Sequence, residues 1–180
     1  MTAVPPHERR TFLLVPVAAD ALVADFRRRH HAASVASGLP PHITVLFPFA
    51  HGVNVARDRG AELAAHFAAI EPFEATLTGV GRFDHFVWLA PEPRERFVDL
   101  LTATRNRFPG SAAPEDVSRA PEPHLTIAAV AQDESTESVV ASARFEFQPL
   151  LPFHFTVDSV WLYESREDRT WQMSSRFQLG

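Results

Sequence analysis

A short pattern that occurs twice is the feature of this sequence that most restricts its fold. The segment PHITV at residues 41–45 is matched by PHLTI at residues 123–127, an offset of 124 − 42 = 82. A second pair, PFEATL at residues 72–77 and PFHFTV at residues 152–157, is offset by 152 − 72 = 80. Two matches with nearly equal offsets indicate that the chain contains two copies of one unit.

The expected secondary structure repeats in the same order. In each half, hydrophobic spacing predicts a strand, a helix, the strand with the repeated His-x-Thr pattern, a second helix and a last strand. In the first half these elements are expected at residues 11–17, 20–31, 42–48, 55–70 and 73–83. In the second half they are expected at residues 86–90, 94–108, 124–131, 135–143 and 153–163, with a closing strand at 171–177. Gly79 and Gly81 indicate a bulge or a close approach to a neighbour in the strand at 73–83.

The length and the repeat together predict the fold class. At 180 residues the chain has the size of one domain, or of two small lobes that share a core. We expect a single domain, residues 1–180, with approximate lobes at 11–85 and 86–177. Alternating strands and helices are also typical of a parallel, doubly wound sheet. The duplication favours an α+β fold with a pseudo-two-fold axis, in which two antiparallel sheets form a central cleft and the helices lie outside; the sequence leaves both arrangements open.

The repeated pattern has a chemical interpretation. Residues i and i+2 of a strand point to the same face, so His42 lies beside Thr44 and His124 lies beside Thr126. If the two strands flank the pseudo-two-fold axis, two imidazoles and two hydroxyls converge on one small volume. A neutral imidazole can take a proton from an attacking water, and a protonated one can give a proton to the leaving oxygen. Because the hydroxyls can donate to the non-bridging oxygens, the set suits a phosphodiester.

Each of these residues also has a structural explanation when it is considered alone. A histidine in an apolar strand is usually a buried, hydrogen-bonded core residue, and threonine is common in strands because it favours them. The repetition within a duplicated unit favours function for the matched pairs. The remaining histidines do not form a metal-binding spacing with a carboxylate, so we expect neither a metal nor another cofactor.

Composition excludes several other classes of function. The chain has no Cys, and all 17 basic residues are Arg, so thiol nucleophiles, disulfide scaffolds and lysine-dependent chemistry are absent. The net charge of −5 argues against tight binding of long nucleic acids, whose affinity depends on neutralising many phosphates. The polar first ten residues do not resemble a secretion signal, and no apolar run is long enough for a membrane span, so we expect a cytoplasmic protein.

The twin strands resemble those of the two-histidine (2H) phosphoesterase superfamily, which includes 2′-5′ RNA ligase-like proteins and RNA cyclic phosphodiesterases. The similarity extends from the strand at Thr11, through residues 42–49, to the Trp171 region and the ending at 177–180. It implies a bilobal pseudo-symmetric α+β fold with the active cleft between the lobes. It also implies metal-independent hydrolysis or transfer at 2′,3′-cyclic, 2′,5′ or related phosphodiesters.

By the same resemblance, four residues form the catalytic set: His42, Thr44, His124 and Thr126. The analogy makes His42 the general acid and His124 the general base. The pseudo-symmetry would also allow the two roles to be exchanged.

The residues that contact the rest of the substrate are harder to identify from the sequence. Many members of the superfamily place an aromatic residue near the second motif, but Ala128 and Ala129 follow Ile127 here. The aromatic candidates are Phe47, Phe49, Phe83, His85 and Trp88, each of which could instead pack in the core or at the rim. The candidates for holding the phosphate are Arg82 and Arg119.

The leading functional hypothesis is a phosphodiesterase that acts on 2′,3′-cyclic or related phosphodiesters of a nucleotide or a short RNA end. We expect it to be a monomer without membrane or long-duplex partners. The first alternative is a 2′-5′ RNA ligase or a phosphodiesterase acting on longer RNA, for which steeply salt-dependent RNA binding would be evidence. The second is a module that binds nucleotides or RNA without turnover.

Overall fold

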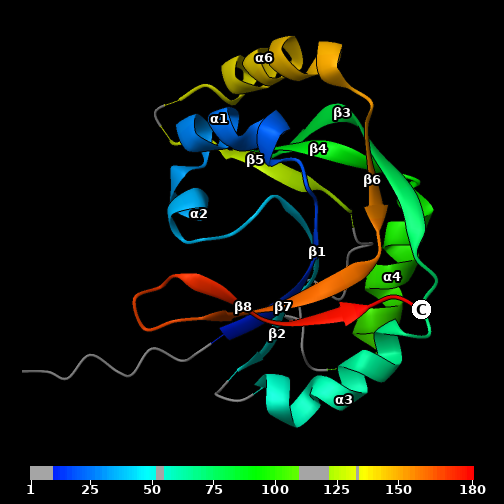
Figure 1. Cartoon of the computed structure of the whole chain (residues 1–180). Coiled ribbons are helices and arrows are strands. Elements are labelled where there is room, and N and C mark those ends of the chain that lie inside the picture. The colour runs from blue at the N-terminus through cyan, green and yellow to red at the C-terminus, as the bar shows by residue number, and fades with distance from the viewer. Residues whose placement is uncertain (1–9, 52–54, 110–121, 133) are drawn as a thin grey trace, which may run out of the picture.

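Eight strands of the computed structural model form one antiparallel sheet within the described residues, which are 10–51, 55–109, 122–132 and 134–180. The strands are β1 (Arg10–Pro16), β2 (His42–His51), β3 (Phe73–Phe83), β4 (Phe86–Glu92), β5 (Leu125–Ala129), β6 (Phe153–Val157), β7 (Ser159–Ser165) and β8 (Trp171–Gln178). Their order in the sheet is β6-β3-β4-β5-β2-β1-β7-β8, and the sheet is strongly curled (Figure 1). The parallel alternative is therefore wrong, and the predicted α+β class is confirmed.

The helices lie on the outside of the curled sheet (Figure 1). They are α1 (Asp20–His30), α2 (Ala32–Ala36), α3 (Val55–Phe67), α4 (Arg94–Arg107), α6 (Thr136–Phe147) and the short 3₁₀ helix η1 (Gln148–Leu150). Helix α1 packs on β5 and α6 on β3 and β4, whereas α4 packs on β2 and α3 on β7 and β8. Four of the helices were predicted, but α2 was not. None of the helices in the described ranges is both long and apolar enough to span a bilayer.

The sheet differs in one respect from the expected pair of sheets. Strands β2, β1, β7 and β8 form one half and strands β6, β3, β4 and β5 the other. The halves are joined because β2 pairs with β5 through Ile43 and Leu125. Two separate sheets were expected, but this link makes the sheet continuous.

The two copies of the repeated unit exchange strands between the halves. Strand β3, from the first copy, lies in the half that contains β4 and β5. Strand β7, from the second copy, lies beside β1, and β8 lies beside β7. Each repeated segment also pairs with its own copy, through Ile43 and Leu125 in one case and through Ala75 and Phe155 in the other. This reciprocal pairing is what a pseudo-two-fold axis requires. The expected lobes, 11–85 and 86–177, therefore both contribute to each half of the sheet.

One predicted strand is divided in two. The segment at 153–163 was expected to form a single strand, but it is interrupted at Asp158. Its first part, β6, lies at the edge of the sheet beside β3, and its second part, β7, pairs with β1 at the other end. The chain at Asp158 thus crosses between the two halves, and the Asp158 carbonyl accepts a hydrogen bond from the Leu179 N–H at 2.8 Å.

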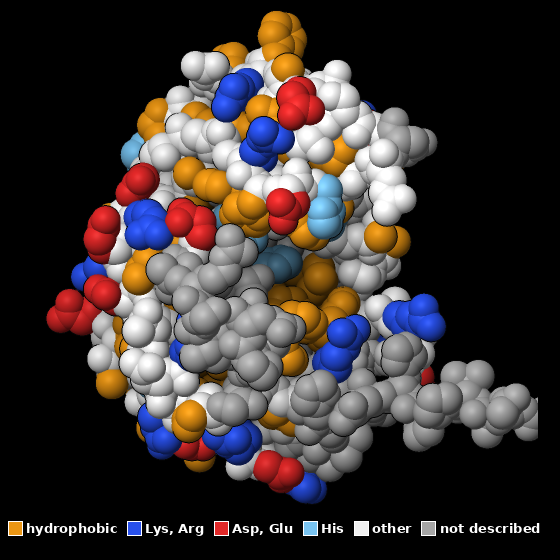
Figure 2. Space-filling model, turned by 180° about the vertical axis from the view of Figure 1, so that it is seen from behind, with side chains coloured by type: hydrophobic (Ala, Val, Ile, Leu, Met, Phe, Trp, Pro, Cys, Tyr) orange, Lys and Arg blue, Asp and Glu red, His pale blue; other side chains and the backbone are white. Residues whose placement is uncertain are grey.

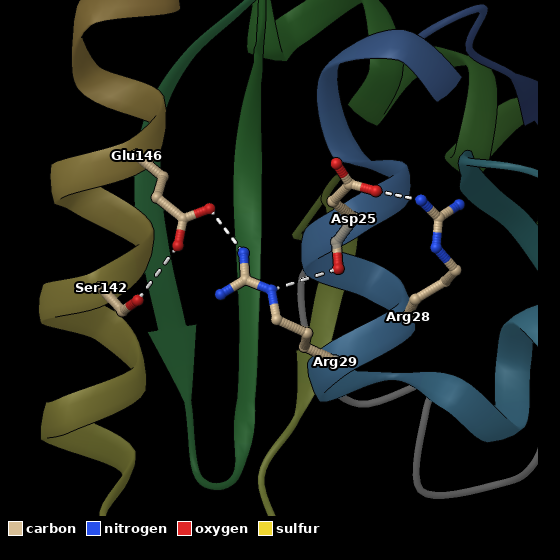
Figure 3. Close-up of polar contacts among 5 residues, drawn as sticks. All are labelled: Asp25, Arg28, Arg29, Ser142 and Glu146. Carbon is tan, nitrogen blue, oxygen red and sulfur yellow. Dashed lines mark hydrogen bonds and ion pairs between the residues drawn. The ribbon is translucent and has the colours of Figure 1, made fainter.

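Helices α1 and α6 are linked by polar contacts on the surface (Figure 3). Arg29 on α1 donates to the Glu146 carboxylate at 2.6 Å, and Ser142 donates to the same carboxylate at 3.3 Å. Arg28 pairs with Asp25 within α1. Because exposed ion pairs contribute little to the free energy of unfolding, the position of these helices depends mainly on their buried apolar faces.

Two glycines in β3 allow a test of how closely β3 and β4 pack. The pairing of the two strands shifts register between Leu77 and Gly79, which confirms the predicted bulge. A Cβ atom added at Gly81 would overlap the Trp88 ring, whereas one added at Gly79 would meet no atom within 4 Å. We expect Gly81→Ala to lower the free energy of unfolding by about 1–3 kcal/mol because the indole must move. Denaturant unfolding should show a much smaller change for Gly79→Ala, and equal effects would contradict this packing.

Candidate active site

The two predicted catalytic strands lie side by side. Strands β2 and β5 are antiparallel neighbours, and Ile43 pairs with Leu125. Both of these side chains are 0% exposed and belong to the main core. Since side chains alternate between the faces of a strand, the histidine and threonine of each motif lie on the opposite, inner face. All four of these residues are partly exposed.

The register of this pairing sets the geometry of the site. An antiparallel register continued from Ile43 and Leu125 sets His42 opposite Thr126 and Thr44 opposite His124. The two histidines are then diagonal neighbours, for which Cα atoms are about 7–8 Å apart. The charge of His124 also acts on His42, as expected for close imidazoles. The structure thus brings together the four residues that the sequence pattern predicted.

Both imidazole rings are held in the same way. His42 Nδ1 lies 2.8 Å from the carbonyl oxygen of Pro40, and His124 Nδ1 lies 2.7 Å from that of Glu122. A carbonyl oxygen only accepts, so each Nδ1 carries the proton and donates it. In the neutral ring, Nε2 is therefore the nitrogen that can accept a proton.

The surroundings of the two imidazoles differ in charge. The pKa of His42 is lowered to about 4, mainly by burial; the charges of Arg27, His124 and His31 act in the same direction, and the hydrogen bond to Pro40 opposes them. Burial also lowers the pKa of His124, but its hydrogen bond to the Glu122 carbonyl and the Glu122 carboxylate both oppose that change. Both rings are therefore neutral at pH 7 without a ligand. A bound phosphate would favour their protonated forms, because it is an anion.

The low pKa of His42 predicts a pH dependence of stability. In the unfolded chain a histidine titrates near 6.5, so between about pH 6.5 and 4 the unfolded state binds more protons than the folded state. The free energy of unfolding therefore has its full value above this window. It falls as the pH is lowered through the window, by about 3 kcal/mol from His42 alone. Between pH 7 and pH 4.5, denaturant unfolding should show a smaller decrease in the free energy of unfolding for His42→Gln than for the wild type. An equal decrease in the two proteins would contradict the lowered pKa of His42.

Aromatic side chains line the inner face beside His42. Phe12 lies 5.6 Å from the His42 ring, and it contacts Phe47 edge-on at 5.6 Å and Trp171 edge-on at 4.9 Å, measured between ring centroids. Phe12, Leu14 and Tyr163 form a buried cluster separate from the main core. Phe47 is 39% exposed, so part of its ring remains open to a ligand.

A second aromatic group lies beside His124. The Phe83 ring meets the His124 ring edge-on at 4.8 Å, and the Trp88 ring lies 6.1 Å away. Phe83 and Trp88 also contact each other at 5.3 Å. Trp88 pairs in register with Thr126, which places it on the inner face of the sheet. Figure 2 shows a recessed histidine side chain bordered by hydrophobic side chains in a hollow of the surface.

Other candidates for substrate contact lie elsewhere. Phe49 is 1% exposed and packs edge-on against Phe108 in the main core, on the same face of β2 as Ile43 and Val45. Arg82 pairs with Val87, whose side chain is in the core, so Arg82 lies on the outer face, where it binds Glu137 at 3.1 Å. These two predictions are therefore not supported.

Two further candidates do not form part of the described site. His85 is exposed in the turn between β3 and β4, and its ring contacts Phe86 at 4.3 Å. Arg119 lies outside the residues that the structure describes. Within the described ranges, no group of three or more histidines and carboxylates is arranged to hold a metal ion.

Several residues at the site were not predicted from the sequence. Arg10 lies over the Phe47 ring at 5.7 Å, and Phe12 and Trp171 complete the aromatic group beside His42. Arg27 lies behind His42 and donates to the Leu39 and Pro40 carbonyls. The only signal in the sequence was Arg27 itself, a charged residue on the side of the helix that also carries Val23 and Phe26.

The comparisons with known proteins concern the fold and the family of the chain. The chain is similar in structure to LigT of E. coli complexed with NADP+ (TM-score 0.63, 20% identity, 96% of this chain and 98% of that chain). It is also similar to TT0787 of Thermus thermophilus (TM-score 0.57, 17% identity, 94% and 97%) and to Kluyveromyces marxianus Usb1 (TM-score 0.52, 15% identity, 95% and 99%). At these identities the likeness shows the fold alone, and no curated protein gives a significant sequence match. The family model described as the 2′-5′ RNA ligase superfamily matches residues 15–169, which confirms the resemblance seen in the sequence, and the chain belongs to that superfamily.

Proposed function

We propose that the protein is a metal-independent phosphodiesterase that hydrolyses 2′,3′-cyclic or related 2′-linked phosphodiesters of nucleotides or RNA ends. Membership of the superfamily supports an activity of the phosphodiesterase or ligase type. The observation that carries the finer proposal is the pair of imidazoles on adjacent strands, each with Nδ1 bound to a backbone carbonyl. This arrangement directs the reactive nitrogens without any metal ligand.

The reaction requires two proton transfers at one phosphorus atom. One neutral imidazole takes a proton at Nε2 from the attacking water, and the new P–O bond forms in line with the bond that breaks. The second imidazole, protonated once the phosphate anion is bound, gives a proton to the departing ribose oxygen. A cyclic phosphodiester then becomes a phosphomonoester with a free hydroxyl on the adjacent ribose carbon.

The two threonines stabilise the charge that develops on the phosphate. Thr44 and Thr126 lie on the same face as the imidazoles. In the described part of the chain, neither hydroxyl has a protein hydrogen-bond partner, so each can donate to a non-bridging oxygen. Donors that are already oriented are more effective than water, because they do not have to reorganise during the reaction.

The aromatic groups are the proposed contacts for the base. The nucleotides in the LigT structures, which include NADP+, 3′-AMP and ATP, support a nucleotide ligand. Stacking of a base on an aromatic ring contributes about 1–3 kcal/mol. We therefore expect Phe47→Ala to raise KM for a 2′,3′-cyclic nucleotide by about tenfold with little change in kcat. Phe145→Ala, which removes a ring that is 85% exposed on α6, should leave KM unchanged, and equal effects would contradict the contact.

The decisive experiment is product analysis on a panel of 2′,3′-cyclic, 2′,5′-linked and 3′,5′-linked substrates, with and without a chelator. The proposal predicts hydrolysis of a 2′,3′-cyclic or 2′-linked phosphodiester at the same rate in both conditions. Joined RNA strands would show instead the ligase activity that the superfamily description names. Loss of turnover with the chelator, or nucleotide binding without any product, would overturn the proposal.

A further inference from the structure

A buried arginine shares a hydrogen-bond acceptor with one of the two histidines. Arg27 is 4% exposed. Its Nη2 donates to the Leu39 carbonyl at 3.0 Å, to the Pro40 carbonyl at 3.4 Å and to Ser34 Oγ at 3.3 Å. The Pro40 carbonyl also accepts from His42 Nδ1 at 2.8 Å. One backbone oxygen thus joins the guanidinium of α1 to the imidazole of β2.

The energetics of Arg27 are unusual for a structural residue. A buried charge is costly unless it is paired, and an apolar side chain of similar size would avoid that cost. Among the described residues, no carboxylate lies within ion-pair distance of Arg27, and its Nε has no hydrogen-bond partner. Its polar contacts are all directed at the segment that leads into β2. This points to a role in holding that segment rather than in core packing.

The pseudo-symmetric half of the site has a different arrangement. His124 Nδ1 donates to the Glu122 carbonyl, and the Glu122 carboxylate binds the Arg94 guanidinium at 2.8 Å on the surface. The charge of buried Arg27 therefore acts on His42, whereas the Glu122 carboxylate acts on His124. The other titratable groups that act on His42 are His124, directly before β5, and His31, directly after α1.

We propose that Arg27 is a positioning residue for His42, which it holds through the Pro40 carbonyl that both side chains share. This inference rests on the proposed function. It is consistent with the asymmetry of charge around two rings that are otherwise held in the same way. A cation behind an imidazole disfavours its protonated form, and a carboxylate favours it.

The test measures the titration of His42 by ¹H–¹⁵N NMR in the ligand-free protein and the pH profile of kcat/KM. In Arg27→Gln the cation is lost, so the midpoint of the His42 titration should rise by about one pH unit. The limb of the kcat/KM profile that reports the titration of His42 should move with it. Arg27→Lys keeps the charge but loses the fork of donors, so it should retain the midpoint while kcat falls by about tenfold. Arg28→Gln, an exposed neighbour on the same helix, is the matched control and should change neither quantity.

A folded Arg27→Gln protein with an unchanged His42 midpoint would overturn the proposal. If that variant does not fold, Arg27→Lys provides the test, because it keeps the charge and loses the fork of donors. A folded Arg27→Lys protein with an unchanged kcat, or with a shifted His42 midpoint, would again overturn the proposal. The NMR titration needs no substrate, so the role of Arg27 can fail or succeed independently of the phosphodiesterase activity.

Discussion

Replacement of either His42 or His124 by alanine is expected to lower kcat by about 10²–10⁴ while the protein remains folded. In the proposed reaction each ring is a proton-transfer group whose Nδ1 is already bound to a carbonyl. The double variant should lose little more than the worse single variant, because the two groups act in one step. Rates with a 2′,3′-cyclic nucleotide, measured beside circular dichroism spectra, check this expectation.

The matched control for this prediction is His154→Ala. His154 is an exposed histidine on β6, and its removal should leave kcat unchanged. Full activity of a folded His42→Ala or His124→Ala protein would show that the reaction does not use the pair. A uniform loss in all three variants would indicate a general effect on folding instead.

Loss of one threonine hydroxyl should have the second largest effect. In Thr44→Val or Thr126→Val the side chain keeps its shape and its preference for strands, but it loses the donor. A donor that stabilises charge in the transition state contributes about 10²–10³ in kcat. We expect kcat to fall by that amount with a small change in KM, and Thr→Ser at the same positions to retain most of the activity because the hydroxyl remains.

Thr156→Val is the control for the threonine variants. Thr156 lies on β6, where its hydroxyl donates to Glu74 at 2.9 Å, away from the two histidines. Its replacement should not alter kcat. If Thr44→Val instead raised KM and left kcat unchanged, the hydroxyl would bind the ground state and the transition state equally well.

Most of the secondary structure could be predicted because its signals are local. The strand expected at 73–83 has those bounds in the structure, and the helix expected at 94–108 ends one residue earlier. The continuous sheet could not be predicted, because it depends on the pairing of β2 with β5, which are 82 residues apart. The division of 153–163 into β6 and β7 has the same origin, since it follows from the crossing between the halves of the sheet.

The candidate site shows the same difference between local and non-local information. His42, Thr44, His124 and Thr126 were found because a strand places i and i+2 on one face. The same rule places Phe49, seven residues after His42, on the core face, so its assignment to the site was wrong. Phe47, five residues after His42, reaches the inner face because register shifts between β1 and β2 interrupt the alternation.

The remaining residues of the site depend on contacts between distant parts of the chain. Phe12 and Trp171 meet because β1, β7 and β8 are neighbours in the sheet, and Trp171 lies far from Phe12 along the chain. Arg27 acquires its role only when α1 packs against the segment before β2. No spacing rule within one element could reveal such contacts.

The central claim is that His42 and His124 act on one shared phosphate, and a titration of the ligand-free protein with a nucleoside 2′-monophosphate tests it most directly. The Nε2 resonances of both histidines should shift along one common binding curve in ¹H–¹⁵N NMR spectra, while those of His85 and His154 stay unchanged. A nucleotide that binds but shifts only one of the two imidazoles, or neither, would contradict the claim.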